Sequence, residues 1–98
     1  MMNVNSVAAL MALPIGTKLK IVRTAKGKCA PSGRIFSKVN RRNVEIEMTV
    51  DDPSSKYNGQ SSSLPLMGSE VVPTDNGFRI VAVSNARVLV EYEFSEAA

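Results

Sequence analysis

The sequence predicts an all-β fold, a small five-stranded antiparallel barrel with a short helix near its N-terminus. The chain has 98 residues, of which 44% are hydrophobic and 21% charged, and this balance is typical of one compact domain. From Gly16 onward, apolar residues alternate with polar ones at the period of two that characterises strands. Turn signals recur along the chain, and no amphipathic segment of helix length lies between the strands, which excludes an α/β fold.

Residues 6–13 are predicted to form the short helix. Ser6 or Asn5 is suited to cap the first free N–H groups, and Pro14 followed by Gly16 ends the helical pattern. A helix of two turns is marginal by itself, so it must pack on other elements. We expect it to close one end of the barrel, and the alternative is a contact in a homodimer.

Residues 16–50 are predicted to form a basic strand–loop–strand unit followed by a third strand. The unit comprises a strand, a loop, a second strand and a turn: Thr17–Thr24, Ala25–Ser32, Gly33–Val39 and Asn40–Asn43. Alternation in the second strand places Ile35, Ser37 and Val39 on one face, which leaves Phe36 on the other. Val44–Val50 is the clearest strand, with four residues expected to face inward: Val44, Ile46, Met48 and Val50.

The C-terminal half is predicted to hold a mobile polar loop and a hairpin. Residues 51–63 include a Pro, an Asn-Gly pair and three consecutive serines, and are assigned to the loop. Residues 64–67 are predicted to form either a short strand or a loop. The hairpin spans residues 78–94, with Asn85-Ala86 as its turn and Phe78, Tyr92 and Phe94 in the core. At this size, five strands favour an SH3-like or OB-like barrel in a single domain, residues 1–98.

The charges are distributed very unevenly along the chain. Residues 1–42 contain nine of the twelve Lys and Arg residues and none of the nine Asp and Glu residues, so the two parts carry charges of +9 and −6. Such asymmetry indicates an electrostatic partner, and bases of this kind neutralise phosphates without reading sequence. The candidate contacts are Lys18, Lys20, Lys26, Lys28, Arg34, Lys38, Arg41 and Arg42. The alternative is that these bases pair with carboxylates on adjacent strands: Glu45, Glu47, Glu91 and Glu93.

Two aromatic residues are candidates for stacking against bases. Alternation along the strand places Phe36 on the same face as Arg34 and Lys38, so its ring is expected to be exposed. Tyr57 lies beside Lys56 in the polar loop. Binding of single strands usually relies on several stacking platforms. Two rings offer little surface for stacking, so the expected ligand is the backbone of duplex or structured RNA or DNA instead of a single strand.

Part of the basic segment resembles the KOW motif of SH3-like barrels in ribosomal proteins and transcription elongation factors. The resemblance spans residues 16–47 and rests on Gly16-Thr-Lys-Leu-Lys-Ile-Val-Arg, Lys26-Gly27-Lys28, Gly33-Arg34-Ile35 and Val44-Glu45-Ile46-Glu47. The chain departs from the motif between Gly27 and Gly33, where its loop is longer. The resemblance implies binding to RNA, DNA or a transcription or translation machine without catalysis, with Lys26, Lys28 and Arg34 as contacts.

Several kinds of chemistry are disfavoured by composition. The chain has no histidine, the commonest general acid–base and metal ligand, and its one cysteine, Cys29, allows no internal disulfide or Cys–His nucleophile. Cys29 is expected to be a small, partly buried thiol. Asp51-Asp52 precedes a Pro and is interpreted as a turn rather than a metal site. The longest apolar stretch, Val7–Leu13, is far too short to cross a bilayer.

The sequence therefore predicts a non-enzymatic, cytoplasmic barrel without cofactor, metal or membrane contact. Its expected function is to bind nucleic acid through the basic N-terminal half. The alternative is a protein–protein interaction module, an adaptor or small inhibitor that docks electrostatically on a larger enzyme or nucleoprotein complex.

Overall fold

The computed structural model describes residues 3–95. They form one short helix and seven strands, in the order α1 (Val7–Met11), β1 (Lys18–Thr24), β2 (Gly27–Asn40), β3 (Glu45–Val50), β4 (Ser61–Pro65), β5 (Ser69–Pro73), β6 (Gly77–Ala82) and β7 (Val88–Phe94). The predicted all-β class and the short N-terminal helix are confirmed.

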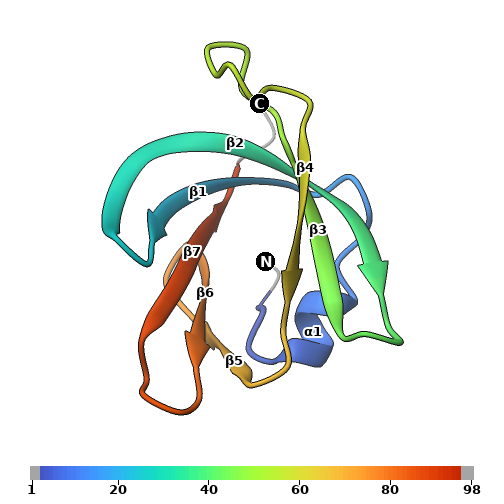
Figure 1. Ribbon diagram of the computed structural model, residues 1–98, viewed down its shortest axis with the longest axis vertical. Coiled ribbons are helices and arrows are strands. Elements are labelled where there is room, and N and C mark those ends of the chain that lie inside the picture. Colours follow the sequence, from blue (N-terminus) through green and yellow to red (C-terminus); the bar gives the residue numbers. More distant parts are fainter. Residues whose placement is uncertain (1–2, 96–98) are drawn as a thin grey trace.

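All seven strands belong to one antiparallel sheet that curls around the core without closing (Figure 1). The strand order is β4-β3-β2-β1-β7-β6-β5, so two meanders, β1 to β4 and β5 to β7, are joined where β1 pairs with β7. The predictions of five strands and of a closed barrel are wrong. The additional strands, β4 and β5, are the two edges of the sheet, and no ladder joins them within the described residues. Each ends at a proline, which cannot donate to a ladder hydrogen bond.

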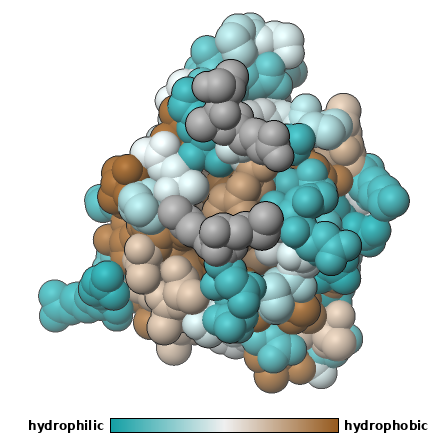
Figure 2. All heavy atoms as spheres, turned by 180° about the vertical axis from the view of Figure 1, so that it is seen from behind, coloured by the Kyte–Doolittle hydropathy of each residue, from teal (hydrophilic) through white to brown (hydrophobic). Residues whose placement is uncertain are grey.

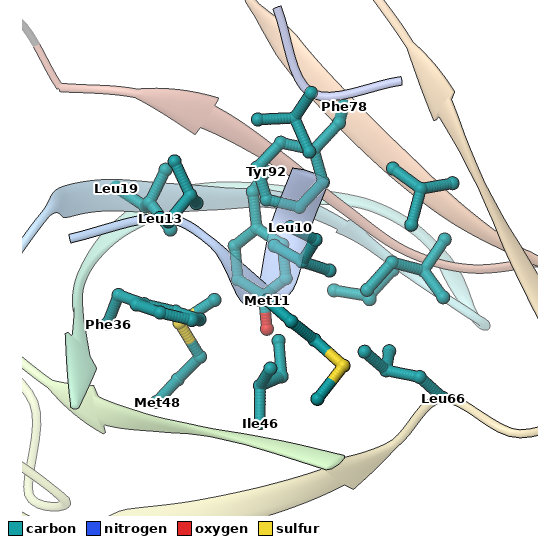
Figure 3. Close-up of a cluster of buried hydrophobic side chains, with 14 residues drawn as sticks. Leu10, Met11, Leu13, Leu19, Phe36, Ile46, Met48, Leu66, Phe78 and Tyr92 are labelled. Carbon is teal, nitrogen blue, oxygen red and sulfur yellow. The ribbon is translucent and has the colours of Figure 1, made fainter. Parts of the chain in front are cut away.

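Helix α1 is capped as expected. The Ser6 side chain accepts a hydrogen bond from the N–H of Ala9 at 3.0 Å, which satisfies one of the free donors of the first turn. The helix is shorter than predicted, because it ends at Met11. Leu10 and Met11 are buried in the core, and the helix fills the hollow of the curled sheet instead of closing a barrel (Figure 3).

The core lies on the concave face of the sheet, and it contains Phe36, contrary to expectation. The Phe36 side chain is fully buried and pairs across the ladder with Met48, also buried. The register of β2 shifts between Phe36 and Lys38, which makes Ser37 an extra residue in a bulge. Simple alternation fails at this bulge, because Phe36 before it and Val39 after it both face the core. The predicted exposure of the Phe36 ring is therefore wrong.

In strands whose central part has no such bulge, the side chains lie on the faces of the sheet that alternation predicts. Ile46 and Met48 of β3 are buried, and so are Val90 and Tyr92 of β7. The predicted aromatic core is also confirmed: the ring of Phe78 lies 5.6 Å from that of Tyr92 and 6.0 Å from that of Phe94, measured between centroids.

The two predicted loops are shorter than expected. Thr24 pairs with Gly27, so β1 and β2 are joined by a tight turn at Ala25-Lys26, and residues 27–32 belong to β2 instead of a loop. Gly27 has φ of 118°, in a region that favours glycine. The polar loop after Val50 is closed at its base by backbone hydrogen bonds to residues 59 and 60, and β4 begins at Ser61. Strands β6 and β7 form the C-terminal hairpin, but residues 83–87 lie between them, so the predicted two-residue turn at Asn85-Ala86 is wrong.

Candidate nucleic-acid interface

The tip of the β1–β2 hairpin gathers basic side chains on the outer, convex face of the sheet. Arg23 and Lys28 are directly opposite each other in the ladder, and Lys26 lies in the turn between the strands. Arg23 also pairs with Glu91 of β7, whose neighbours Val90 and Tyr92 face the core, which places Arg23 on the outside. The hairpin therefore carries three cations within six residues of chain.

Two further bases, from the acidic half of the sequence, join this tip. Arg79 of β6 lines the same groove as Arg23 and Lys28. Arg87, in the β6–β7 turn, donates from Nη2 to the carbonyl of Ala25 at 3.5 Å. We call these five residues the hairpin basic surface: Arg23, Lys26, Lys28, Arg79 and Arg87. Sequence reasoning did not select Arg23, Arg79 or Arg87 as contacts. The last two come close to the hairpin only through the register of β7 against both β1 and β6.

A groove of about 490 Å³ runs through this surface. Its lining combines basic, acidic and small apolar side chains, and includes the only cysteine: Val22, Arg23, Lys28, Cys29, Pro31, Arg79, Glu91 and Glu93. Cys29 is exposed, so the expectation of a partly buried thiol is wrong. Residues 29–31 lie in β2 with their side chains largely in solvent, because the hairpin extends beyond the core.

Acidic side chains neutralise part of the basic charge, as the alternative interpretation predicted for β7. The Glu91 carboxylate lies 3.0 Å from Nη2 of Arg79 and 3.9 Å from Nε of Arg23, so one carboxylate serves two guanidinium groups. Glu93 lies 4.0 Å from the amine of Lys20. The Lys20–Glu93 pair is partly exposed, and exposed pairs stabilise a protein by only about 0–1 kcal/mol. The Glu91 side chain is only 14% exposed, so its pairs with Arg23 and Arg79 are more sheltered from solvent. Within residues 3–95, Lys26, Lys28 and Arg87 have no carboxylate within 4.0 Å.

The remaining predicted bases are not on this surface. Lys18 and Lys20 lie further along the outer face of β1. Lys38, Arg41 and Arg42 lie at the opposite end of β2, by the β2–β3 turn. Figure 1 shows the two ends of β2 on opposite sides of the molecule. The nine bases of residues 18–42 therefore form separate groups instead of one continuous face.

Arg34 is separated from the others because it lies on the concave side of β2. It pairs in the ladder with the buried Leu19, and its Nη1 donates to the hydroxyl of Ser32 at 2.9 Å and to the carbonyl of Gly33 at 2.8 Å. The Ser32 hydroxyl in turn donates to Asp52 at 2.7 Å. Hydrogen bonds from Ser54 and Ser32 and the positive charge of Arg34 hold the pKa of Asp52 below its usual value. The guanidinium group thus has a structural role in anchoring the loop after β3.

Of the two predicted stacking rings, only Tyr57 is exposed. Its side chain is 52% exposed, and the amine of Lys56 lies 5.2 Å from the ring centroid, within the range of a cation–π contact. With Phe36 buried, the described residues offer a single aromatic candidate for stacking on a base, and it lies in the loop before β4.

Comparisons with protein-family models, curated proteins and solved structures gave no match for this chain. Residues 3–95 contain no helix that is both long and apolar enough to cross a membrane. In the same part of the chain, no three side chains of the metal-binding types come together; Asp52 instead accepts hydrogen bonds from the N–H and the hydroxyl of Ser54, in keeping with a turn.

Proposed function

We propose that the protein binds the phosphate backbone of nucleic acid at the hairpin basic surface. The observation that carries this proposal is the convergence of cationic side chains from separate segments of the chain. Arg23, Lys28 and Arg79 line one groove, in which Glu91 and Glu93 are the only acids, and Arg87 contacts the hairpin turn at Ala25, next to Lys26. Guanidinium and ammonium groups bind phosphate oxygens, and guanidinium groups do so through paired donors.

The shape of the hairpin supports binding to a double-stranded or structured backbone. A two-stranded β-ribbon fits into a nucleic-acid groove, and the Ala25-Lys26 turn projects from the body of the protein on the left of Figure 1. The single exposed aromatic ring gives little support to stacking on unpaired bases. The resemblance of Lys26-Gly27-Lys28 to the basic loop of KOW motifs supports the same assignment.

Fluorescence anisotropy with labelled duplex DNA, a hairpin RNA and a single-stranded DNA tests the proposal. We expect the protein to bind the duplex and the hairpin more tightly than the single strand at low salt. The variant Lys26→Ala/Lys28→Ala is expected to weaken binding to all sequences by a similar factor, because phosphate contacts carry no sequence information.

The matched control is Arg41→Ala/Arg42→Ala, which also removes two exposed charges, but at the other end of β2. It is expected to leave duplex affinity nearly unchanged. An affinity weaker than about 1 mM for all three probes at low salt, weaker than ordinary non-specific binding, contradicts the proposal. An equal loss in both double variants contradicts the assignment to the hairpin.

A further inference from the structure

A second groove, distinct from the hairpin basic surface, lies at the other end of β2. It has a volume of about 390 Å³, in the range of roughly 300–1,000 Å³ that is typical of ligand sites. It lies between the segment that follows α1 and the end of β2. We call it the helix–turn groove, and its lining residues are Met11, Ala12, Leu13, Ile15, Ser37, Lys38, Val39 and Arg41.

Ile15 is an exposed aliphatic side chain that the fold holds in a fixed position. It is 60% exposed, although the segment around it is tightly hydrogen-bonded. The N–H of Gly16 donates to the carbonyl of Phe36 at 2.7 Å, and the N–H of Phe36 donates to the carbonyl of Thr17 at 2.9 Å. The Thr17 hydroxyl and N–H both donate to the carbonyl of Pro14, at 2.6 and 3.1 Å. A side chain displayed on so well-anchored a turn loses little freedom when a partner covers it.

The rest of the groove is apolar at its base and basic at its rim. Met11 and Leu13 are buried beneath it, and the bulge at Ser37 keeps Val39 towards the core while Lys38 faces solvent. Bulges are enriched beside functional sites because they redirect a side chain in this way. In Figure 2, apolar surface on the left of the view lies next to the hydrophilic projection of the β2–β3 turn.

The basic groups at the rim are available to a partner's carboxylates. Lys38 and Arg41 are exposed, and within residues 3–95 no carboxylate lies within 4.0 Å of either side chain. Glu47 is directly opposite Lys38 in the ladder, yet the two do not form an ion pair by this distance. An apolar base is poorly suited to a sugar–phosphate backbone, whereas it suits aliphatic side chains. The complementary ligand therefore combines apolar and acidic groups.

We propose that the helix–turn groove docks a peptide segment of a partner protein in which large apolar side chains alternate with Asp or Glu. An apolar side chain of the partner covers Ile15 and fills the space above Leu13, and its carboxylates pair with Lys38 and Arg41. This surface is separate from the hairpin basic surface, so the protein can bind a protein and a nucleic acid at once.

Selection from a library of random short peptides, with the full chain immobilised, tests this proposal. Selected peptides are expected to be enriched in large apolar residues together with Asp and Glu. Their affinity is expected to fall about ten-fold or more in Ile15→Asp and in Lys38→Glu/Arg41→Glu, and to weaken with added salt. The matched control, Lys26→Glu/Lys28→Glu, is expected to keep full affinity.

The altered residues are exposed, so the variants are expected to fold, and circular dichroism with thermal unfolding checks this directly; Ile15→Ser serves as a milder second variant. Failure to select any peptide, or selection of peptides that bind the groove variants as tightly as the parent, overturns the proposal. The proposal is also overturned if Lys38→Glu/Arg41→Glu loses as much duplex DNA affinity as Lys26→Glu/Lys28→Glu, because the groove is then part of the nucleic-acid site.

Discussion

Phe36 shows how one inserted residue decides which side chain enters the core. The bulge at Ser37 lets β2 bend, and it assigns Phe36 to the core and Ile35 to the outer side. The Phe36 ring is fully buried among core residues from other elements, such as Leu19 and Met48 (Figure 3). A close-packed environment of this kind does not relax around a missing ring.

Phe36→Ala is therefore expected to lower the free energy of unfolding by about 3–5 kcal/mol, measured by urea denaturation. Ile35→Ala is the matched control on the neighbouring position. Because Ile35 is only half-buried, its truncation is expected to cost about 1–1.5 kcal/mol. The reverse order of the two losses is the result that simple alternation predicts, and it would show that β2 has no bulge at Ser37.

Tyr92 provides a second test at the residue scale, because burial raises the pKa of its phenol to about 12. Because the ordinary pKa of a tyrosine phenol is 10.0, this shift means that the folded state favours the neutral phenol. This contribution to stability is complete below pH 10 and is lost as the pH rises towards 12. In Tyr57→Phe, where Tyr92 is the remaining tyrosine, ultraviolet titration should show ionisation near pH 12, together with loss of the folded circular dichroism signal. Ionisation near pH 10 with the fold intact would contradict the burial of this ring.

At the scale of elements, the short helix depends on its N-cap. Ser6 accepts a hydrogen bond from Ala9, while Asn5, the alternative cap, lies outside the helix. Ser6→Ala is expected to destabilise the protein by about 1 kcal/mol in thermal unfolding, and Asn5→Ala by much less. A larger effect of Asn5→Ala than of Ser6→Ala would mean that the helix begins one residue earlier.

The elements that were correctly predicted are those in which local pattern and tertiary packing agree. Residues 45–50 and 90–94 alternate without interruption, so their faces follow directly from the sequence. Strand β4 begins with three serines and β5 is bounded by Ser69 and Pro73, and such residues have little preference for strands. These two strands form because the neighbouring β3 and β6 offer them a ladder, which is a tertiary effect invisible to local pattern.

The candidate site was predictable only in part, for a similar reason. Lys26 and Lys28 were identified as members of the basic N-terminal cluster and through the resemblance to the KOW loop, although they were placed in a loop longer than the observed turn. Arg79 and Arg87 lie more than fifty residues further along the chain, and only the pairing of β7 with both β1 and β6 brings them to that tip. Arg79 lies directly opposite Glu91 in the β6–β7 ladder, a relation that becomes visible only once the strand register is known.

At the scale of the whole molecule, the pairing of the first strand with the last explains how the two charged halves of the sequence combine. Strand β1 carries bases and β7 carries acids, and their antiparallel register sets Lys20 opposite Glu93 and Arg23 opposite Glu91. The +9 and −6 halves therefore do not become two faces. Within residues 3–95, Lys26 and Lys28 at one end of β2, and Lys38 and Arg41 at the other, have no carboxylate within 4.0 Å. Figure 1 shows these two ends of β2 on opposite sides of the molecule.

The salt dependence of duplex DNA binding tests the central claim most directly. If the hairpin basic surface neutralises about three to five phosphates, the logarithm of the association constant should fall with the logarithm of salt concentration at a slope of about −3 to −4.5. Lys26→Ala/Lys28→Ala should make this slope shallower by about 2, since each lysine neutralises one phosphate. A slope near zero, or a slope that this double variant leaves unchanged, would contradict phosphate binding at the hairpin.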